Sequence, residues 1–376
     1  MKTNKHHRFA LSVFFFLSGF CFSSWASRIP SIKLTFDMDE AELGSFLFIL
    51  PICSLIGLPI SGWLISKFDS RYLLISGFLI CIFSLLGIGY ASNIQLLIFT
   101  VCFFAFGLRA INISMNTQAI QLQKLYGRNI IGNFHGIWSL GGLFGILIAT
   151  TMIFFNITMF LHLAVVVIFS LIFSLCSSSY LLKNDREEGG NKLRLGSPDK
   201  FIFYTGLVVF CAAVCEGGIY DWSSVYFREV VNAELFTLSY LVFMAAMTIS
   251  RFFTDALTEL LGMKKLFLIS ALVVVFGVII LIIFPYFYPA LVGFFITGFG
   301  VASIFPISFS LASHSKKYAP GLAISIVGTY ATVGVLIAPP FVGYIAHLFS
   351  LNLAFLLFVG AALLLIIFSR RAYQQI

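Results

Sequence analysis

Twelve long apolar runs, separated by short polar or Pro- and Gly-containing stretches, are the feature that most constrains this chain. A helix of about 20 apolar residues crosses the hydrocarbon core of a bilayer. The runs lie at about 9–27, 42–65, 72–90, 94–118, 129–153, 158–182, 201–224, 235–257, 266–284, 288–312, 321–345 and 351–369. They predict an all-α membrane protein with twelve transmembrane helices, the first of them an uncleaved span.

The composition excludes a soluble domain. Of 376 residues, 60% are hydrophobic and 10% are charged, against roughly a quarter charged in soluble domains. Twelve spans occupy roughly 240 positions, so no extramembrane catalytic domain fits between them. Neither a G-x-x-x-x-G-K-[ST] loop nor an H-E-x-x-H motif is present. We therefore expect no enzyme activity.

Cysteines and net charge give no sign of a cofactor or of nucleic acid. All seven cysteines fall inside apolar runs, where a free Cys behaves as a small hydrophobe. We expect no disulfide, metal site or other cofactor. The net charge of +8 comes from Lys and Arg scattered singly or in pairs, not from one basic face.

The distribution of Lys and Arg predicts the orientation. Connections and tails on one side of the membrane carry 18 of the 23, those on the other side carry three, and Arg109 and Arg251 lie within spans. Short cytoplasmic loops carry the excess of positive charge. Both termini are therefore predicted to be cytoplasmic, in a multi-pass protein of the bacterial inner membrane.

The longest polar segment, 183–200, lies between six spans and six spans. This arrangement is typical of a duplicated six-helix unit with a connecting linker. We expect an N-terminal half over 1–182, a flexible cytoplasmic linker over 183–200 and a C-terminal half over 201–376.

Ionisable residues inside spans are costly and are the first candidates for a site. Arg109 is followed at i+3, i+7 and i+14 by Asn112, Asn116 and Gln123, which places all four on one helical face. Arg109, Asn112 and Asn116 are predicted to bind an anionic or hydroxyl-rich solute. The alternative is an Arg paired within the helix bundle.

The segment CEGGIYDW carries two acids, Glu216 and Asp221. Gly217 and Gly218 are expected to weaken the helix there, and discontinuous helices hold substrate and ion sites in transporters. Because desolvation favours the neutral form of a carboxylate, Glu216 is a candidate for proton coupling. The alternative is a static salt bridge, for instance to Arg109. Asp221 is assigned to the same coupling group, with an outer-end cap or gate contact as its alternative.

Other polar and aromatic residues complete the candidate set. His135 is a candidate proton relay or an interfacial His, and Arg251 and Asp255, at i and i+4, are predicted to form a cytoplasmic latch. Trp25 and Tyr330 are candidate cavity walls or interface anchors. Glycine pairs at 132/136 and 141/145 are expected to be close-packing surfaces.

Two loops, at 62–71 and 250–265, and five longer stretches resemble the major facilitator superfamily. Gly62 to Arg71 partly matches its loop signature, with Ser66 and Asp69 replacing Asp and Gly, and Lys67 and Arg71 are assigned to the latch. The more specific stretches are WASRIPSIK (25–33), MNTQAIQLQKLYGR (115–128), FHGIWSLGGLFG (134–145), EGGIYDWSSVYFREV (216–230) and GFGVASIFPISFSLA (298–312). Together they resemble the YbjJ-type inner-membrane branch, which is similar to fucose permease-like sugar transporters.

The resemblance implies alternating access around a central cavity lined by the first, fourth, seventh and tenth spans. We expect a monomeric secondary transporter for a small polar solute such as a sugar, coupled to protons as a symporter. Two alternatives stay open: an efflux pump, since 45 Phe could line a greasy cavity, and a membrane-embedded transferase.

Overall fold

The computed structural model describes residues 2–127, 130–183, 199–318 and 320–375. Most of the predicted linker over 183–200 lies outside these ranges. Within them the chain is helical and contains no strand, so the predicted all-α class is confirmed. The helices are α1 (Lys2–Ala26), α2 (Ile29–Thr35), α3 (Glu40–Lys67), α4 (Ser70–Tyr90), α5 (Ile94–Tyr126), α6 (Ile131–Phe154), α7 (Met159–Ser178), α8 (Lys200–Glu229), α9 (Leu238–Leu261), α10 (Met263–Ile283), α11 (Phe287–Val301), α12 (Ile304–Ala312), α13 (Pro320–Leu348), α14 (Leu351–Ala354) and α15 (Leu356–Tyr373).

The predicted spans correspond to these helices. In the described ranges, eleven helical segments are long and apolar enough to cross a membrane, and the apolar part of α9, Leu238–Thr254, is shorter. Two predicted spans are each divided. The run at 288–312 forms α11 and α12, and the run at 351–369 forms α14 and α15.

Local sequence explains where several helices begin. The side chains of Asn93, Thr158, Asp199 and Ser350 each accept a hydrogen bond from a backbone N–H in the first turn of the helix that follows. Before α3, the Glu42 amide donates to Asp39 Oδ1 (2.8 Å) and the Asp39 amide donates to Glu42 Oε2 (3.0 Å). This reciprocal pair is a capping box.

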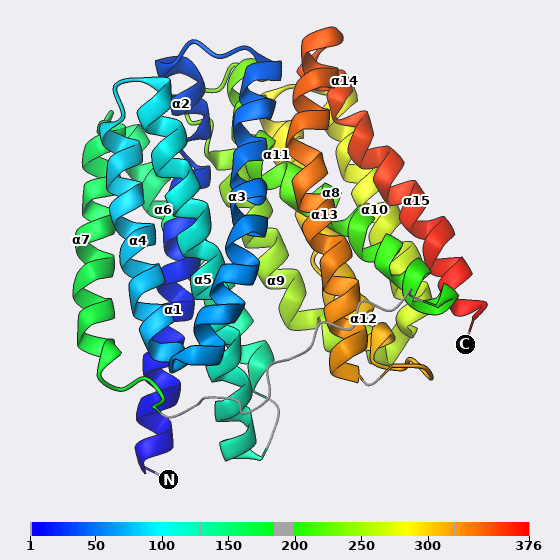
Figure 1. The fold of residues 1–376 in the computed structure, drawn as a ribbon. Helices are drawn as coiled ribbons and strands as arrows, with labels where there is room; N and C mark the ends of the chain where they lie inside the picture. The colour runs from blue at the N-terminus through cyan, green and yellow to red at the C-terminus, as the bar shows by residue number, and fades with distance from the viewer. Residues whose placement is uncertain (1, 128–129, 184–198, 319, 376) are drawn as a thin grey trace. The chain divides into compact units, whose positions relative to one another are not determined.

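The chain divides into two compact units, described separately below. The first unit contains Met1–Phe36 and Ile49–Leu193, and α1 is its most enclosed helix (Figure 1).

Glycines let α6 approach α1 backbone to backbone. A Cβ on Gly141 would lie 2.0 Å from the Phe16 carbonyl oxygen, and one on Gly145 would lie 2.6 Å from that of Phe20. The predicted packing role is thus confirmed for this pair. Gly136 instead faces open space, and the surroundings of its predicted partner at position 132 lie outside what the structure describes.

The second unit contains Asp37–Phe48 and Arg194–Ile376, and α8 is its most enclosed helix. Helix α8 packs against α13 and α15. Gly206 lies beneath the ring of Tyr330 on α13, and Gly218 lies beneath the ring of Phe358 on α15. The start of α3 joins this unit because Gly44 meets Gly343 backbone to backbone.

We predict that Gly141→Ala will lower the apparent melting temperature by about 1–4 °C. The added methyl group would overlap the α1 backbone, and overpacking costs about 1–3 kcal/mol. Gly136→Ala, on the same helix, is the matched control and should leave the melting temperature unchanged or slightly raised. Thermal unfolding of the two purified variants in detergent checks this, and equal shifts would contradict the packing described.

Candidate functional site

Arg109 on α5 sits on a seat of small residues from α3. Its Nε donates to the hydroxyl oxygen of Ser54 at 2.8 Å and, at 3.3 Å, to the Ser54 carbonyl oxygen. The stem of Arg109 lies over Gly57, which has no side chain to displace it. Ser61, one turn further along α3, has a buried hydroxyl with no hydrogen-bond partner among the described residues. Among the described residues, only the Nε side of the guanidinium has hydrogen-bond partners, and its terminal N–H groups have none there.

The other polar residues of the predicted stripe differ in their roles. Asn112 is exposed, and the Asn116 amide nitrogen donates to the Asn112 carbonyl oxygen at 2.8 Å. Both stay on the face of α5 that carries Arg109. Gln123 instead accepts a hydrogen bond from the Ile130 amide at 3.0 Å, so it shapes the turn between α5 and α6.

The described part of the first unit is almost without acids. Over residues 1–36 and 49–183 the sequence contains a single carboxylate side chain, Asp69. That carboxylate, at the N-cap of α4, lies 3.7 Å from Arg71 in the first turn of this helix. Over these residues, no protein carboxylate is therefore left for Arg109, and its charge stays uncompensated by any anion there.

A second buried arginine lies near the end of α1. Arg28 is only 5% exposed; its Nε donates to His162 Nδ1 (3.1 Å) and its Nη2 donates to the Ile157 carbonyl oxygen (3.0 Å). Because His162 Nδ1 accepts, its Nε2 carries the proton, and that atom is buried with no partner among the described residues. This pair holds α7 to the end of α1.

Other predicted residues of the first unit are placed by packing. Trp25 is 1% exposed and lies against Phe104 of α5, with 5.7 Å between the ring centroids, so it belongs to the interior of this unit. His135 is exposed near the start of α6 and meets Phe15 edge to face at 5.8 Å.

Glu216 is the centre of a polar cluster in the second unit. Its Oε1 accepts a hydrogen bond from the Tyr220 hydroxyl at 2.7 Å, one turn along α8, and lies 3.2 Å from Arg251 Nη2 on α9. The Glu216 side chain is 13% exposed and that of Arg251 is 26% exposed. The partner of Glu216 found here is Arg251, not the Arg109 that the sequence suggested as an example.

The second carboxylate oxygen of Glu216 has a different environment. Glu216 Oε2 is buried and has no hydrogen-bond partner among the described residues. The Tyr220 ring meets Tyr240 and Phe243 edge to face, and its hydroxyl also lies 3.5 Å from the Met247 sulfur. One oxygen is thus engaged twice, and the other is buried without a hydrogen-bond partner among the described residues.

The glycines expected to weaken the helix do not break α8. The helix runs unbroken from Lys200 to Glu229, through both glycines. A Cβ on Gly218 would lie 2.4 Å from the Phe358 ring, and one on Gly217 would lie 3.2 Å from Val335. The glycines therefore serve close packing against α13 and α15. Asp221, on the next turn, is half-buried.

The predicted latch residues lie in two units. In the second, Arg251 bonds to Glu216, and the side chain of Asp255 lies outside the part of the chain that the structure describes. In the first, Lys67 Nζ stacks over the Trp63 ring at 4.5 Å, and Arg71 lies between Asp69 and the Tyr72 ring. Tyr330 packs over Gly206, almost three turns of α8 from Glu216.

The structure thus brings together Arg109, Asn112 and Asn116 in one unit and Glu216 and Arg251 in the other. Two contributions were missed. The seat on α3 was visible as Ser54 and Gly57 at i and i+3. Gln118, which is 1% exposed and exchanges hydrogen bonds with the backbone of Leu182 at 3.3 and 3.4 Å, has no comparable signal.

Comparison with known proteins gives consistent matches over almost the whole chain. The model of the Major Facilitator Superfamily matches residues 11–319 and 242–374. An uncharacterised MFS-type transporter of Yersinia pestis is 29% identical over 91% of this chain and 89% of its own length. The membrane protein MosC of Rhizobium meliloti is 27% identical over 94% of this chain and 87% of its own.

Solved structures share the fold at low sequence identity. The nucleoside transporter NupG is 14% identical, with a TM-score of 0.76 over 100% of both chains. A bacterial homologue of the human lysosomal transporter Spinster is 12% identical, with a TM-score of 0.76 over 99% of this chain and 98% of its own. The chain therefore belongs to the major facilitator superfamily and is a multi-pass membrane transporter for small solutes.

Proposed function

We propose that this protein is a proton-coupled secondary transporter of the bacterial inner membrane that moves a small polar solute by alternating access. The two halves that alternate are residues 1–182 and 201–376, joined by the cytoplasmic linker over 183–200. The protein acts as a monomer, with both termini in the cytoplasm. The observation that carries proton coupling is the asymmetric environment of the Glu216 carboxylate.

Proton coupling follows because a proton and Arg251 compete for the Glu216 carboxylate. In its charged form Glu216 holds Arg251 through Oε1, at 3.2 Å. A proton that binds at the unpartnered Oε2 removes the negative charge and weakens this ion pair. The loaded state therefore releases Arg251 of α9 from Glu216, and proton release restores the pair. Asp221 and His135 stay secondary candidates for proton coupling.

The open guanidinium of Arg109 supports an anionic group on the solute. An Arg fork recognises a carboxylate or phosphate through two parallel hydrogen bonds. The α3 seat engages the Nε side, and the only acid of residues 1–36 and 49–183 lies beside Arg71. An anionic solute would supply the missing countercharge, with Asn112 and Asn116 binding its hydroxyl groups.

The class of solute can be narrowed by testing a panel of candidate compounds for binding. The resemblance to YbjJ-type proteins and to fucose permease-like transporters favours sugars, and NupG is a nucleoside transporter. Acidic sugars, neutral sugars, nucleosides and small carboxylates should therefore be compared for thermal stabilisation of the purified protein, because a ligand of the folded state raises its apparent stability. Efflux of amphipathic compounds is the other candidate, and greater drug sensitivity of a deletion strain would favour it.

Glu216→Gln should abolish accumulation driven by a pH gradient while leaving solute exchange intact. The amide keeps an acceptor for Tyr220 but cannot switch between a charged and a neutral form by taking up a proton. The measurement is uptake into proteoliposomes with and without an imposed pH gradient. Glu259→Gln, which changes an exposed acid near the end of α9, is the matched control and should behave like wild type. Undiminished accumulation by the Glu216→Gln variant would remove Glu216 from the coupling mechanism.

Arg109→Lys should raise the KM for an anionic solute about tenfold or more, although the charge is kept. A lysine has no planar fork to bind two oxygens, and a lost charge-assisted hydrogen bond costs about 1.5–3 kcal/mol. Ser54→Ala should have a smaller effect in the same direction, because it loosens the guanidinium without removing it. Initial uptake rates over a range of solute concentrations give these values. A KM equal to that of wild type in the lysine variant would contradict substrate binding by Arg109.

The orientation has its own test. Fusion of a fluorescent protein that folds only in the cytoplasm should give bright cells when it is attached after Ile376. Fusion of alkaline phosphatase at the same position should give no activity, since that enzyme needs the periplasm. The reverse pattern would place the C-terminus outside and overturn the assignment from Lys and Arg counts.

A further inference from the structure

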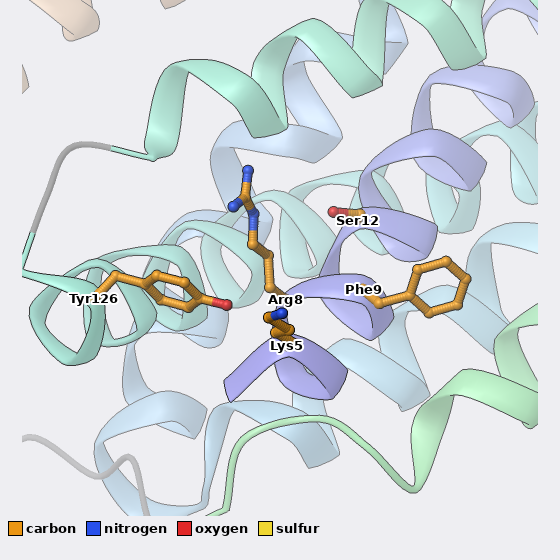
Figure 2. Close-up of a pocket in the computed structure, with 5 residues that line it drawn as sticks. All are labelled: Lys5, Arg8, Phe9, Ser12 and Tyr126. Carbon is orange, nitrogen blue, oxygen red and sulfur yellow. The ribbon is translucent and has the colours of Figure 1, made fainter. Parts of the chain in front are cut away.

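A basic pocket lies in the first unit, away from Arg109, where the amino end of α1 meets the carboxyl end of α5. Its volume is about 340 Å³, and its lining residues are Lys5, Arg8, Phe9, Ser12 and Tyr126. Figure 2 shows the Tyr126 ring reaching towards Lys5 and Arg8 from α5, with Phe9 extending from α1 away from Tyr126. We propose that this pocket binds the phosphate group of an anionic phospholipid such as phosphatidylglycerol.

The two cations of the pocket lack a counter-ion among the described residues of this unit. Lys5 and Arg8 share one face of α1 at i and i+3. The contact of Arg8 is with the Tyr126 ring, 5.7 Å from its centroid, which leaves the hydrogen-bonding edge of the guanidinium available. The single acid of residues 1–36 and 49–183, Asp69, lies beside Arg71. A bound phosphate would therefore compensate charges that no acid over these residues neutralises.

The helix turn that carries the two cations is held in place by contacts on its opposite side. On the opposite side of the same α1 turns, His7 Nδ1 lies 2.7 Å from the Tyr180 carbonyl oxygen. The His6 ring stacks on the Tyr180 ring, with 5.8 Å between centroids. These contacts tie the amino end of α1 to the residues that follow α7. The cations are thus held on a packed helix, and little conformational entropy would be lost on binding.

The order of residues along α1 favours a lipid over a soluble anion. From Lys5 and Arg8 the lining passes to Phe9, which is 70% exposed, and then to Ser12, where α1 enters its apolar stretch. Charged residues thus come first and apolar surface follows, in the order of a headgroup and its acyl chains. Basic pockets between transmembrane helices at the membrane surface bind anionic headgroups in this way.

The test compares charge-matched variants of the full-length protein. Binding of phosphatidylglycerol is measured by native mass spectrometry and by thermal stabilisation in detergent, with phosphatidylcholine as the uncharged reference. Lys5→Gln/Arg8→Gln should bind phosphatidylglycerol at least roughly tenfold more weakly than wild type. Lys264→Gln/Lys265→Gln removes the same charge from exposed residues at the start of α10 and should stay within about twofold of wild type.

Two outcomes would overturn the proposal. Equal losses of phosphatidylglycerol binding in both double variants would show that overall charge, and not the pocket, determines lipid binding. The other outcome is that inorganic phosphate or glycerol 3-phosphate stabilises wild type but not the pocket variant. That result would show that the pocket binds a soluble phosphate and not a lipid. The single variants Lys5→Gln and Arg8→Gln, checked for monodispersity, give intermediate losses if the pocket is the site, and they keep the test valid if the double variant misfolds.

Discussion

The bilayer offers no water to the backbone, and this constraint determines the rest of the structure. Every peptide N–H and C=O in the hydrocarbon core must find its partner within the chain, which leaves long helices as the solution here. Because lipid is as apolar as Leu, packing between the helices depends on close approach and on a few polar contacts. Gly141 and Gly145 supply the first between α6 and α1, and Gln118 supplies the second at the end of α7.

Charge is scarce under the same constraint, so each charged group within a span is informative. The two units use it differently. The first has one acid over residues 1–36 and 49–183 and leaves the fork of Arg109 open, whereas the second pairs Glu216 with Arg251 through a single carboxylate oxygen. In the function proposed above, the first arrangement receives an anionic solute and the second receives a proton. Separate elements for solute and coupling ion are what a coupled transporter needs, because each can then bias the same conformational equilibrium.

Hydropathy and residue spacing predicted most of the fold, and they predicted the candidate site only in part. Apolar runs determine where helices form, so the spans were found, and the polar face of α5 followed from the 3.6-residue period. Partners across helices do not follow from a period along one helix. Ser54 beneath Arg109 and Arg251 beside Glu216 depend on which helix faces meet. The glycine pair in α8 was interpreted as a weak point because helix propensity considers only the local sequence. The structure shows instead that the Phe358 ring occupies the space that a side chain at Gly218 would fill.

The unbroken course of α8 has a mechanical consequence. Thirty residues of continuous helix form a rod about 45 Å long, comparable to the full thickness of a membrane. Glu216 is fixed on this rod and cannot change its depth by local unwinding. Any switch in the side from which water reaches its carboxylate must come from the helices that cover it. Helix α9, which carries Arg251 and the aromatic residues that meet the Tyr220 ring, is the helix whose displacement would change the contacts of Glu216 in the proposed coupling.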